Sequence, residues 1–191
     1  MSLQADAVRA LSAWAAPTPD QVAARAAFLS YLADHDDAMW RECSPSHVTA
    51  SALVLDPAAR RVLLTFHRKV GRWLQTGGHC EPGDLTLAAA ALREATEESG
   101  IIGLELLDRP ARLDRHPVRC RGPAEPDCEH LDVQFVALAP PGSRESRSEE
   151  SVDLRWWPVG GLPAGVDGSV RALVACALAL TGEARRSRPD S

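Results

Sequence analysis

The sequence predicts an α+β domain in which helices pack on a mixed β-sheet. Three observations support this class: two strand-like segments joined by a tight turn, a well-bounded helix directly after a glycine-rich segment, and a second group of strands that ends in an apolar helix. Segments of both kinds share one chain with an antiparallel hairpin, which favours helices on a mixed sheet. The 191 residues suffice for one domain of ordinary size with an extension.

Residues 1–45 are predicted to form two helices ahead of the main domain. The second helix has a clear start, with Thr18 as N-cap, Pro19 in the first helical position and Gln21 placed to complete a capping box. Its apolar stripe consists of Phe28, Leu29 and Leu32. We expect a helical extension that packs on the domain, and a dimerisation or lid role stays open.

The main domain is expected over residues 46–181. Its predicted strands are two hairpin strands around Asp56-Pro57, a later strand and a short final one, at 48–55, 61–67, 131–138 and 154–157. The segments between them are a basic turn at 68–72, a glycine-rich loop at 77–84 and a polar loop at 140–151. An apolar helix at 170–180 ends the domain, and residues 182–191 are expected to be a disordered tail.

A strong helix is predicted from Leu87 to Ser99. Thr86 suits the N-cap, and Gly100 suits the left-handed position that follows a helix. At 100° per residue the helix divides into two sides. The side expected against the sheet consists of Ala88, Leu92, Ala95 and Ser99. The opposite side carries three carboxylates within an arc of about 100°, on Glu94, Glu97 and Glu98.

Three carboxylates on one helix face repel one another, by about 0.2–0.5 kcal/mol for each close pair. A solvated acidic face with a salt bridge from Arg93 to Glu97 is one interpretation. The other is that the glutamates gather a hard divalent cation, because oxygen ligands on a rigid element suit Mg²⁺ or Mn²⁺. The adjoining Gly77-Gly78 favours the second interpretation, since glycine permits a backbone carbonyl to face the same cation.

These residues resemble the signature of the Nudix hydrolase family. That signature is a glycine, five residues, a glutamate, seven residues and then R-E-U-x-E-E-x-G-U with U aliphatic, and residues 93–101 (REATEESGI) match its second half. A chance match in a chain of this length is on the order of 10⁻⁴. The hairpin before the loop and Trp156-Trp157-Pro158 after the polar loop also resemble the family, so the likeness extends over about residues 46–181.

The first half of the signature departs from the family. Eight residues back from Arg93 lies Leu85, where the family has glutamate. Counted forward from Gly78, Asp84 occupies the glutamate position, but eight residues then separate it from Arg93. One extra residue in the loop explains both counts and leaves the role of Asp84 open.

The resemblance implies a Nudix-like α/β/α sandwich and a hydrolase of diphosphate bonds. By position, Glu94, Glu97 and Glu98 would bind Mg²⁺ (or Mn²⁺), with the Gly77 carbonyl as a further ligand and Arg93 orienting the glutamates. The implied reaction is attack of a metal-activated water on a diphosphate linked to a nucleoside. The implied partner is therefore a small nucleotide-like diphosphate substrate.

The general base varies in location within the family, and Glu149 and Glu150 in the polar loop are candidates, with solvated loop acids as the alternative. Arg68 and Arg72 are candidates to contact substrate phosphates, and Trp73 to stack on a base. For these three residues the alternatives are solvated surface and ordinary core packing.

Two rival functions stay open. A non-catalytic Nudix-like binding module would be expected to have lost signature glutamates, whereas the three at Glu94, Glu97 and Glu98 are all present. A diphosphate isomerase on the same scaffold would need an activated cysteine, and Cys80 is the candidate. His116 and His130, which flank a loop rich in Arg and Pro, are expected to be structural histidines.

The composition indicates in which cellular compartment the protein resides and which classes of partner it can bind. The net charge of -5 argues against a nucleic-acid-binding face. Five scattered cysteines without a CxxC pair argue against a zinc site and against a disulfide framework, which predicts a reducing cytoplasm. Neither a signal peptide nor a membrane-spanning segment is expected. A homodimer stays open.

Overall fold

The structure is a computed structural model that describes residues 1–107, 109–118, 128–148 and 151–186. Within these residues the helices are α1 (Leu3–Ala13), α2 (Pro19–Asp34), α3 (Leu87–Ser99) and α4 (Gly168–Arg186). The strands are β1 (Ser46–Leu55), β2 (Arg61–His67), β3 (Arg72–Leu74), β4 (Thr76–His79), β5 (Glu105–Leu106), β6 (Arg112–Val118), β7 (Cys128–Leu138) and β8 (Ser151–Pro158). In these described segments, no helix combines the length and the apolar character that a membrane crossing requires.

The strands form one mixed sheet around β1. Its main path runs β3-β2-β1-β7-β5, while β4, β6 and β8 pair with β1, β7 and β2 respectively. β1 and β7 are parallel along their length, from Ser46 opposite Glu129 to Leu55 opposite Leu138. The other pairs are antiparallel. The predicted α+β class with a mixed sheet is therefore confirmed.

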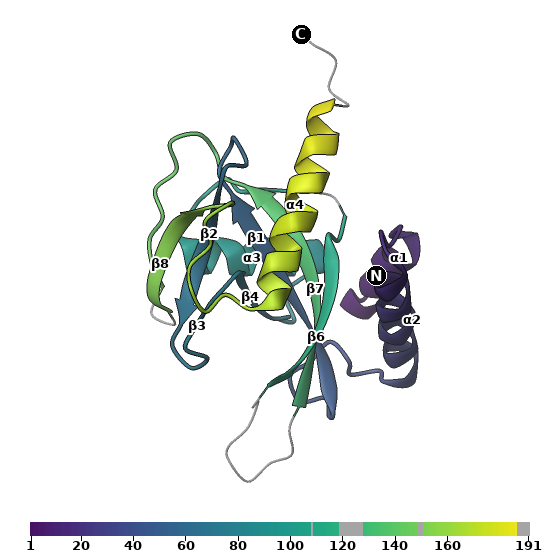
Figure 1. Cartoon of the computed structure of the whole chain (residues 1–191). Helices are drawn as coiled ribbons and strands as arrows, with labels where there is room; N and C mark the ends of the chain where they lie inside the picture. The colour runs from purple at the N-terminus through teal and green to yellow at the C-terminus, as the bar shows by residue number, and fades with distance from the viewer. Residues whose placement is uncertain (108, 119–127, 149–150, 187–191) are drawn as a thin grey trace.

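Alternate residues of β1 face opposite layers of the molecule. Ala50, Ala52 and Val54 pack in one apolar cluster with α1, α2 and α3. Leu53 and Leu55 pack in a second cluster with α4. Because successive strand residues point to opposite faces of a sheet, α3 and α4 cover the two faces (Figure 1). This arrangement is the expected helix–sheet–helix sandwich, in which α1 and α2 belong to the α3 side.

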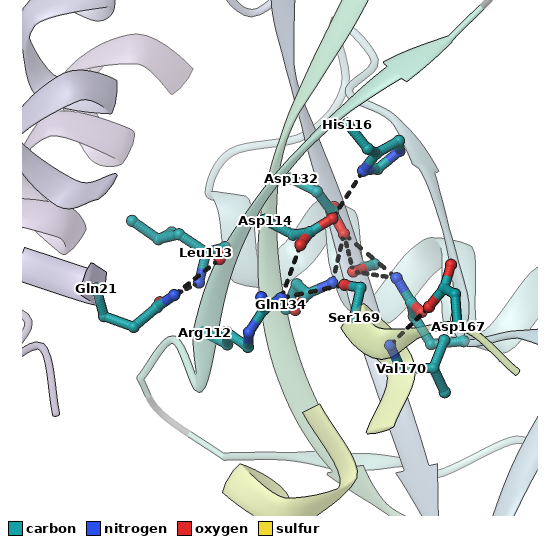
Figure 2. A network of polar contacts seen from close by, with 12 residues as sticks. Gln21, Arg112, Leu113, Asp114, His116, Asp132, Gln134, Asp167, Ser169 and Val170 are labelled. Carbon is teal, nitrogen blue, oxygen red and sulfur yellow. Dashed lines mark hydrogen bonds and ion pairs between the residues drawn. The ribbon is translucent and has the colours of Figure 1, made fainter. Parts of the chain in front are cut away.

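Hydrogen bonds join the N-terminal helices to the rest of the domain. The buried Asp6 side chain accepts a hydrogen bond from the backbone N–H of Leu87, the first residue of α3, at 2.9 Å. The Gln21 side chain donates to the carbonyl of Leu113 at 3.1 Å and accepts from its N–H at 2.7 Å (Figure 2). The extension thus packs on the domain, in agreement with the first expectation for residues 1–45.

The contact from Asp6 gives a prediction about stability. Replacing Asp6 with alanine leaves a buried N–H at the start of α3 without its acceptor, which costs about 1–2 kcal/mol. We expect the melting temperature to fall by roughly 2–8 °C. Thermal unfolding followed by circular dichroism would measure the change. Asp36→Ala, at an exposed position after α2, is the matched control, and an equal loss in both variants would contradict the assigned contact.

A buried polar network lies on the sheet face towards α4 (Figure 2). At its centre is Asp132 of β7, which is 3% exposed and accepts hydrogen bonds of 2.7–3.1 Å from Thr49, Ser51 and Gln134. Burial raises the pKa of Asp132. Nη1 of Arg112 donates to Asp114 at 2.8 Å and to Ser169 at 3.0 Å, which ties β6 to the start of α4. The sequence analysis singled out none of these polar residues.

Several local predictions are wrong. Thr18 is the N-cap of α2 and Pro19 its first residue, as predicted, but the capping box does not form: Thr18 makes no side-chain cap hydrogen bond, and the Gln21 side chain bonds to Leu113 of β6. Residues 77–79, expected in the glycine-rich loop, belong to β4, and the turn expected at 68–72 ends before Arg72, where β3 begins. Helix α4 continues to Arg186, so residues 182–186 of the predicted tail are helical. Strands β5 and β6 were not predicted at all.

Candidate active site

The local sequence around α3 positions the glutamates. The Thr86 side chain accepts a hydrogen bond from the N–H of Ala89 at 3.0 Å, and Gly100 has φ 66° in the left-handed region. Both predicted ends of the helix are confirmed. These caps fix where the helix begins and ends, so Glu94, Glu97 and Glu98 all lie within its second half.

The three glutamates line one cavity of about 800 Å³, a size that suits a small ligand. Within it, the side chain of Glu97 is 60% exposed and that of Glu94 is 16% exposed. Glu98 is buried at 7% exposure. The other lining residues include Gly77, Gly78, His79, Cys80, Glu81 and Arg93. The carboxylates therefore form a graded series from solvent to the interior.

The predicted division of α3 into two faces is wrong in part, since Ala95 and Ser99 are buried as predicted but Glu98 is buried with them. The buried residues of the helix include Ala91, Ala95 and Glu98, so Glu98 lies on the face towards the sheet and not opposite to it. Ala88 and Leu92, expected against the sheet, are only partly buried. The small side chains of Ala91 and Ala95 let α3 lie close to the sheet, which leaves the neighbouring Glu98 buried.

Gly77 and Gly78 make room for this close approach. A Cβ atom added at Gly78 would lie 2.7 Å from Oε1 of Glu94, and one added at Gly77 would lie 2.3 Å from Cβ of Ser51. Both glycines lie in β4, where Gly77 pairs with Ser51 and Gly78 with Ala50 of β1. The sequence analysis expected Gly77 and Gly78 to allow a close backbone approach from a loop. In the structure the two glycines lie in a strand.

Arg93 connects the glutamates to the segment before the helix. Its Nη1 lies 3.0 Å from Oε1 of Glu94 and 3.2 Å from Oε2 of Glu97. Its Nη2 donates to the carbonyl of His79 at 3.0 Å. One guanidinium therefore contacts two of the three carboxylates, and the orienting role of Arg93 stays a prediction.

The Arg93 guanidinium also donates two hydrogen bonds to the carboxylate of Asp84. Oδ1 accepts from Nε at 3.1 Å and Oδ2 accepts from Nη2 at 3.0 Å. Burial raises the pKa of Asp84, but the hydrogen bonds from Arg93 and from the N–H of Glu81 outweigh it and hold the pKa below the usual value. Leu85 is 78% exposed. Asp84 therefore supports Arg93, while Leu85 points away from the site.

This arrangement predicts unequal effects at Asp84 and Glu97. Asp84→Asn should lower kcat by no more than about tenfold, because the residue acts on the carboxylates only through Arg93. Glu97→Gln should lower kcat by about a hundredfold or more if Glu97 is one of the residues that hold the ion. Steady-state kinetics of both folded variants would test this. Equal losses would show that Asp84 itself binds the metal.

The donor set fits a hard divalent cation. Three carboxylates in one cavity supply the oxygen ligands that Mg²⁺ and Mn²⁺ prefer. The space left by the missing side chain of Gly78 is filled by the carboxylate of Glu94, so β4 is shaped around this group. Glu94, Glu97 and Glu98 are thus the residues that would hold the ion, and Gly77 lines the same cavity.

The other predicted site residues lie elsewhere or outside the described part of the chain. Arg68 and Arg72 are exposed at the turn between β2 and β3, and neither lines the cavity. The ring of Trp73 packs 5.4 Å from that of Phe66 and 5.3 Å from that of Trp157, measured between centroids. Trp73 is therefore part of the core around α4. Glu149 and Glu150 lie outside the described residues.

The cavity also contains residues that the sequence did not single out. Trp40, Arg41 and Glu42, which follow α2, line it together with Ser148. His79 lines it as well, and burial, with the nearby His47, lowers the pKa of His79 to about 4. No periodic or motif signal marks the segment at 40–42, because its proximity to α3 arises only from the packing of the N-terminal helices.

Comparison with known proteins identifies the fold. The NUDIX domain model matches residues 45–174. Among solved structures, a hydrolase of the NUDIX family from Clostridium perfringens is 25% identical, with a TM-score of 0.52 over 72% of this chain and 97% of that chain. An Ap4A hydrolase from C. elegans is 16% identical, with a TM-score of 0.56 over 71% and 98% of the two chains.

A dihydroneopterin triphosphate pyrophosphohydrolase from E. coli is 20% identical, with a TM-score of 0.55 over 69% of this chain and 95% of that chain. Among curated proteins no relative matches this chain. The NUDIX match covers more than half of the sequence and contains the glycines of β4 and the glutamates of α3. The chain therefore belongs to the Nudix hydrolase family, whose members act on diphosphate-containing substrates.

Proposed function

We propose that this protein is a Mg²⁺-dependent (or Mn²⁺-dependent) pyrophosphohydrolase that cleaves the diphosphate bond of a small nucleoside diphosphate-linked molecule. The observation that carries the proposal is the gathering of Glu94, Glu97 and Glu98 in one cavity beside the glycines of β4. A divalent cation bound there would offset phosphate charge and lower the pKa of a bound water.

The chain's own residues have distinct parts in this proposal. Glu97 is the most exposed of the three carboxylates and is the one that meets the substrate side of the cavity. Glu98 is buried, so its charge is stabilised best when a cation lies beside it. Arg93 keeps the carboxylates of Glu94 and Glu97 in place. Gly77 is proposed as a carbonyl ligand.

The general base is proposed to be Glu149 or Glu150. Support comes from Ser148, which directly precedes them and lines the cavity, so the chain reaches the site just before these two residues. Arg68, Arg72 and Trp73 stay predicted substrate contacts. Their test is the Michaelis constant of each alanine variant, which should rise with kcat unchanged if they bind substrate.

The isomerase alternative is disfavoured by the environment of Cys80. Its thiol is 6% exposed, and burial, with the nearby Asp84, raises its pKa to about 12. A thiol with such a pKa stays protonated near neutrality and is a poor nucleophile or acid–base group. The binding-module alternative is disfavoured because Glu94, Glu97 and Glu98, the three glutamates of the second half of the signature, are all present.

A reducing cytoplasm and a small-molecule partner are proposed as the setting. The described cysteines, Cys43, Cys80, Cys128 and Cys176, are free thiols. The net charge of -5 favours a small substrate over a nucleic acid. A homodimer is a prediction that sedimentation analysis would test.

The experiment is a panel of ADP-ribose, nucleoside diphosphate sugars, nucleoside triphosphates and dinucleoside polyphosphates, incubated with Mg²⁺ and resolved by mass spectrometry. We expect phosphate-ester products and no turnover in excess chelator, because the clustered ligands are hard oxygens. An isomerised product of unchanged mass, ligand binding without turnover, or full activity in chelator would each overturn the proposal.

A further inference from the structure

Three histidines from three different strands meet at one place on the sheet. His47 of β1 is paired with His130 of the parallel β7, and His79 of β4 is paired with Thr49, two residues along β1. The ring centroids are 4.8 Å apart for His47 and His130, 5.0 Å for His47 and His79, and 5.1 Å for His79 and His130. One potential ligand atom of each residue lies within 4.8 Å of the other two.

The ring of His79 has a polar atom without a partner. Its Nε2 is buried and makes no hydrogen bond in the described part of the chain. A buried polar nitrogen left in this state costs about 1–3 kcal/mol, so such atoms are usually satisfied. His79, which carries this nitrogen, is one of the three histidines of the group. Ordinary packing of aromatic rings explains the contacts between the rings but leaves this nitrogen unsatisfied.

The chemistry of the three ligands differs from that of the glutamate cluster. Imidazole nitrogens suit Zn²⁺ and related transition metals, whereas Mg²⁺ takes oxygen ligands. Nitrogen ligands at 2.0–2.1 Å from a tetrahedral zinc ion are about 3.3 Å apart. The three atoms would therefore draw together by at most about 1.5 Å from their limit of 4.8 Å, a change that side-chain rotation supplies.

We propose that His47, His79 and His130 form a binding site for a zinc-class transition-metal ion, separate from the glutamates of α3. The proposal does not rest on the proposed hydrolase activity. Three protein ligands leave the fourth tetrahedral position for water, as in sites with an open coordination position. Among the described residues, this is the group of three or more His, Cys, Asp or Glu side chains whose ligand atoms come this close.

Neighbouring side chains support the three rings. Sγ of Cys128 lies 3.5 Å from Nδ1 of His47 and can orient that ring, as second partners of metal-bound histidines do. The nearby His116 is held differently, because its Nδ1 lies 2.9 Å from Oδ2 of Asp114. His116 therefore belongs to the polar network of Figure 2 and not to the proposed ligand set.

The position of the site connects it to the active-site cavity. His79 lines the cavity, and its backbone carbonyl accepts a hydrogen bond from Arg93. An ion bound to the three rings would tie β4 to β1 and β7 directly beside the segment that holds Arg93. We therefore expect the ion to stabilise this part of the sheet.

The test uses the full chain, freed of metal by chelator and dialysed. It is titrated with Zn²⁺ in a calorimeter and with Co²⁺ in a spectrophotometer. We expect one equivalent of each ion to bind, with a visible Co²⁺ absorption band of a nitrogen-ligated site. His79→Gln and His130→Gln should each weaken Zn²⁺ binding by about a hundredfold or more. His67→Gln, at the end of β2 and outside the group, is the matched control and should bind as the wild type does.

Two further measurements decide the location of the ion. Glu98→Gln should retain Zn²⁺ binding, because the proposed ligands are all histidines. In the wild type, the ¹⁵N shifts of three imidazoles should change on addition of one equivalent of Zn²⁺, a readout that does not depend on whether a variant folds. Absence of stoichiometric binding, loss of binding in Glu98→Gln, or wild-type affinity in both folded histidine variants would overturn the proposal.

Discussion

Replacing Glu98 with glutamine is expected to remove the stabilisation of the protein by Mg²⁺ and to lower turnover by about a hundredfold or more. Without metal, the variant should be as stable as the wild type or slightly more stable. The substitution removes a carboxylate that is only 7% exposed and that is repelled by the neighbouring glutamates.

Thermal melts with and without Mg²⁺ separate the two effects. A ligand that binds only the folded state stabilises it by RT ln(1 + [L]/Kd), about 2.7 kcal/mol at a hundredfold excess over Kd. The wild type should show this gain and Glu98→Gln should lose most of it. Glu105→Gln, at an exposed position in β5, is the control and should respond as the wild type does. Identical responses of wild type and Glu98→Gln would mean that the carboxylates are only an acidic surface.

Replacing Arg93 with methionine is expected to give the largest loss of stability. The guanidinium hydrogen-bonds to the Asp84 carboxylate, which is 5% exposed. Removing one partner of a buried ion pair costs about 3–5 kcal/mol, because the other charge is left buried. For a domain of this size the melting temperature should fall by roughly 6–20 °C. Arg115→Met, which breaks an exposed pair with Glu129, should change stability by less than about 1 kcal/mol.

A double variant tests why Arg93→Met is expected to lose stability. If the cost arises from the isolated carboxylate, Asp84→Asn combined with Arg93→Met should be more stable than Arg93→Met alone. Denaturant unfolding of the four proteins gives the coupling energy, and strictly additive losses would contradict the pairing.

The Asp84–Arg93 ion pair also makes the stability of the folded protein depend on pH. The folded-state pKa of Asp84 is depressed, so its contribution is fully present above the ordinary carboxyl pKa of 3.8 and is lost as the pH falls through the folded value. Asp84→Asn should therefore lose less stability than the wild type over roughly pH 5 to 2.

The sequence predicted correctly those helices and strands whose limits are set by residues within or next to the element. The caps at Thr86 and Gly100 fixed the ends of α3, and the apolar run at 61–67 fixed β2, because each signal acts within a few residues. β6 gave no such signal. Its sequence RLDRHPV has little apolar alternation, and it is held as a strand by pairing with β7 and by Gln21 from α2.

The site was predictable where it is contiguous in sequence and not where distant strands meet. The spacing of the glutamates placed them together, but helical periodicity alone put Glu98 on the wrong face, since the position of the sheet is set by tertiary packing. The sequence argument against a zinc site considered the spacing of the cysteines alone. That spacing carries no information on His47, His79 and His130. Those residues lie far apart in the chain, and the sheet topology alone brings them together.

Because Asp6 accepts a hydrogen bond from the N–H of Leu87 at the start of α3, the packed domain and the region of family similarity begin at different residues. The NUDIX match begins at residue 45, whereas the helices that pack on the domain begin at Leu3. A recombinant fragment trimmed to the homologous region would start α3 without its buried acceptor and would expose to water the surface that Leu11 and Phe28 cover. Such a fragment is expected to be prone to aggregation, so the useful truncation limit for this chain is set by the Asp6 side chain at the start of α3 and not by the extent of the family match.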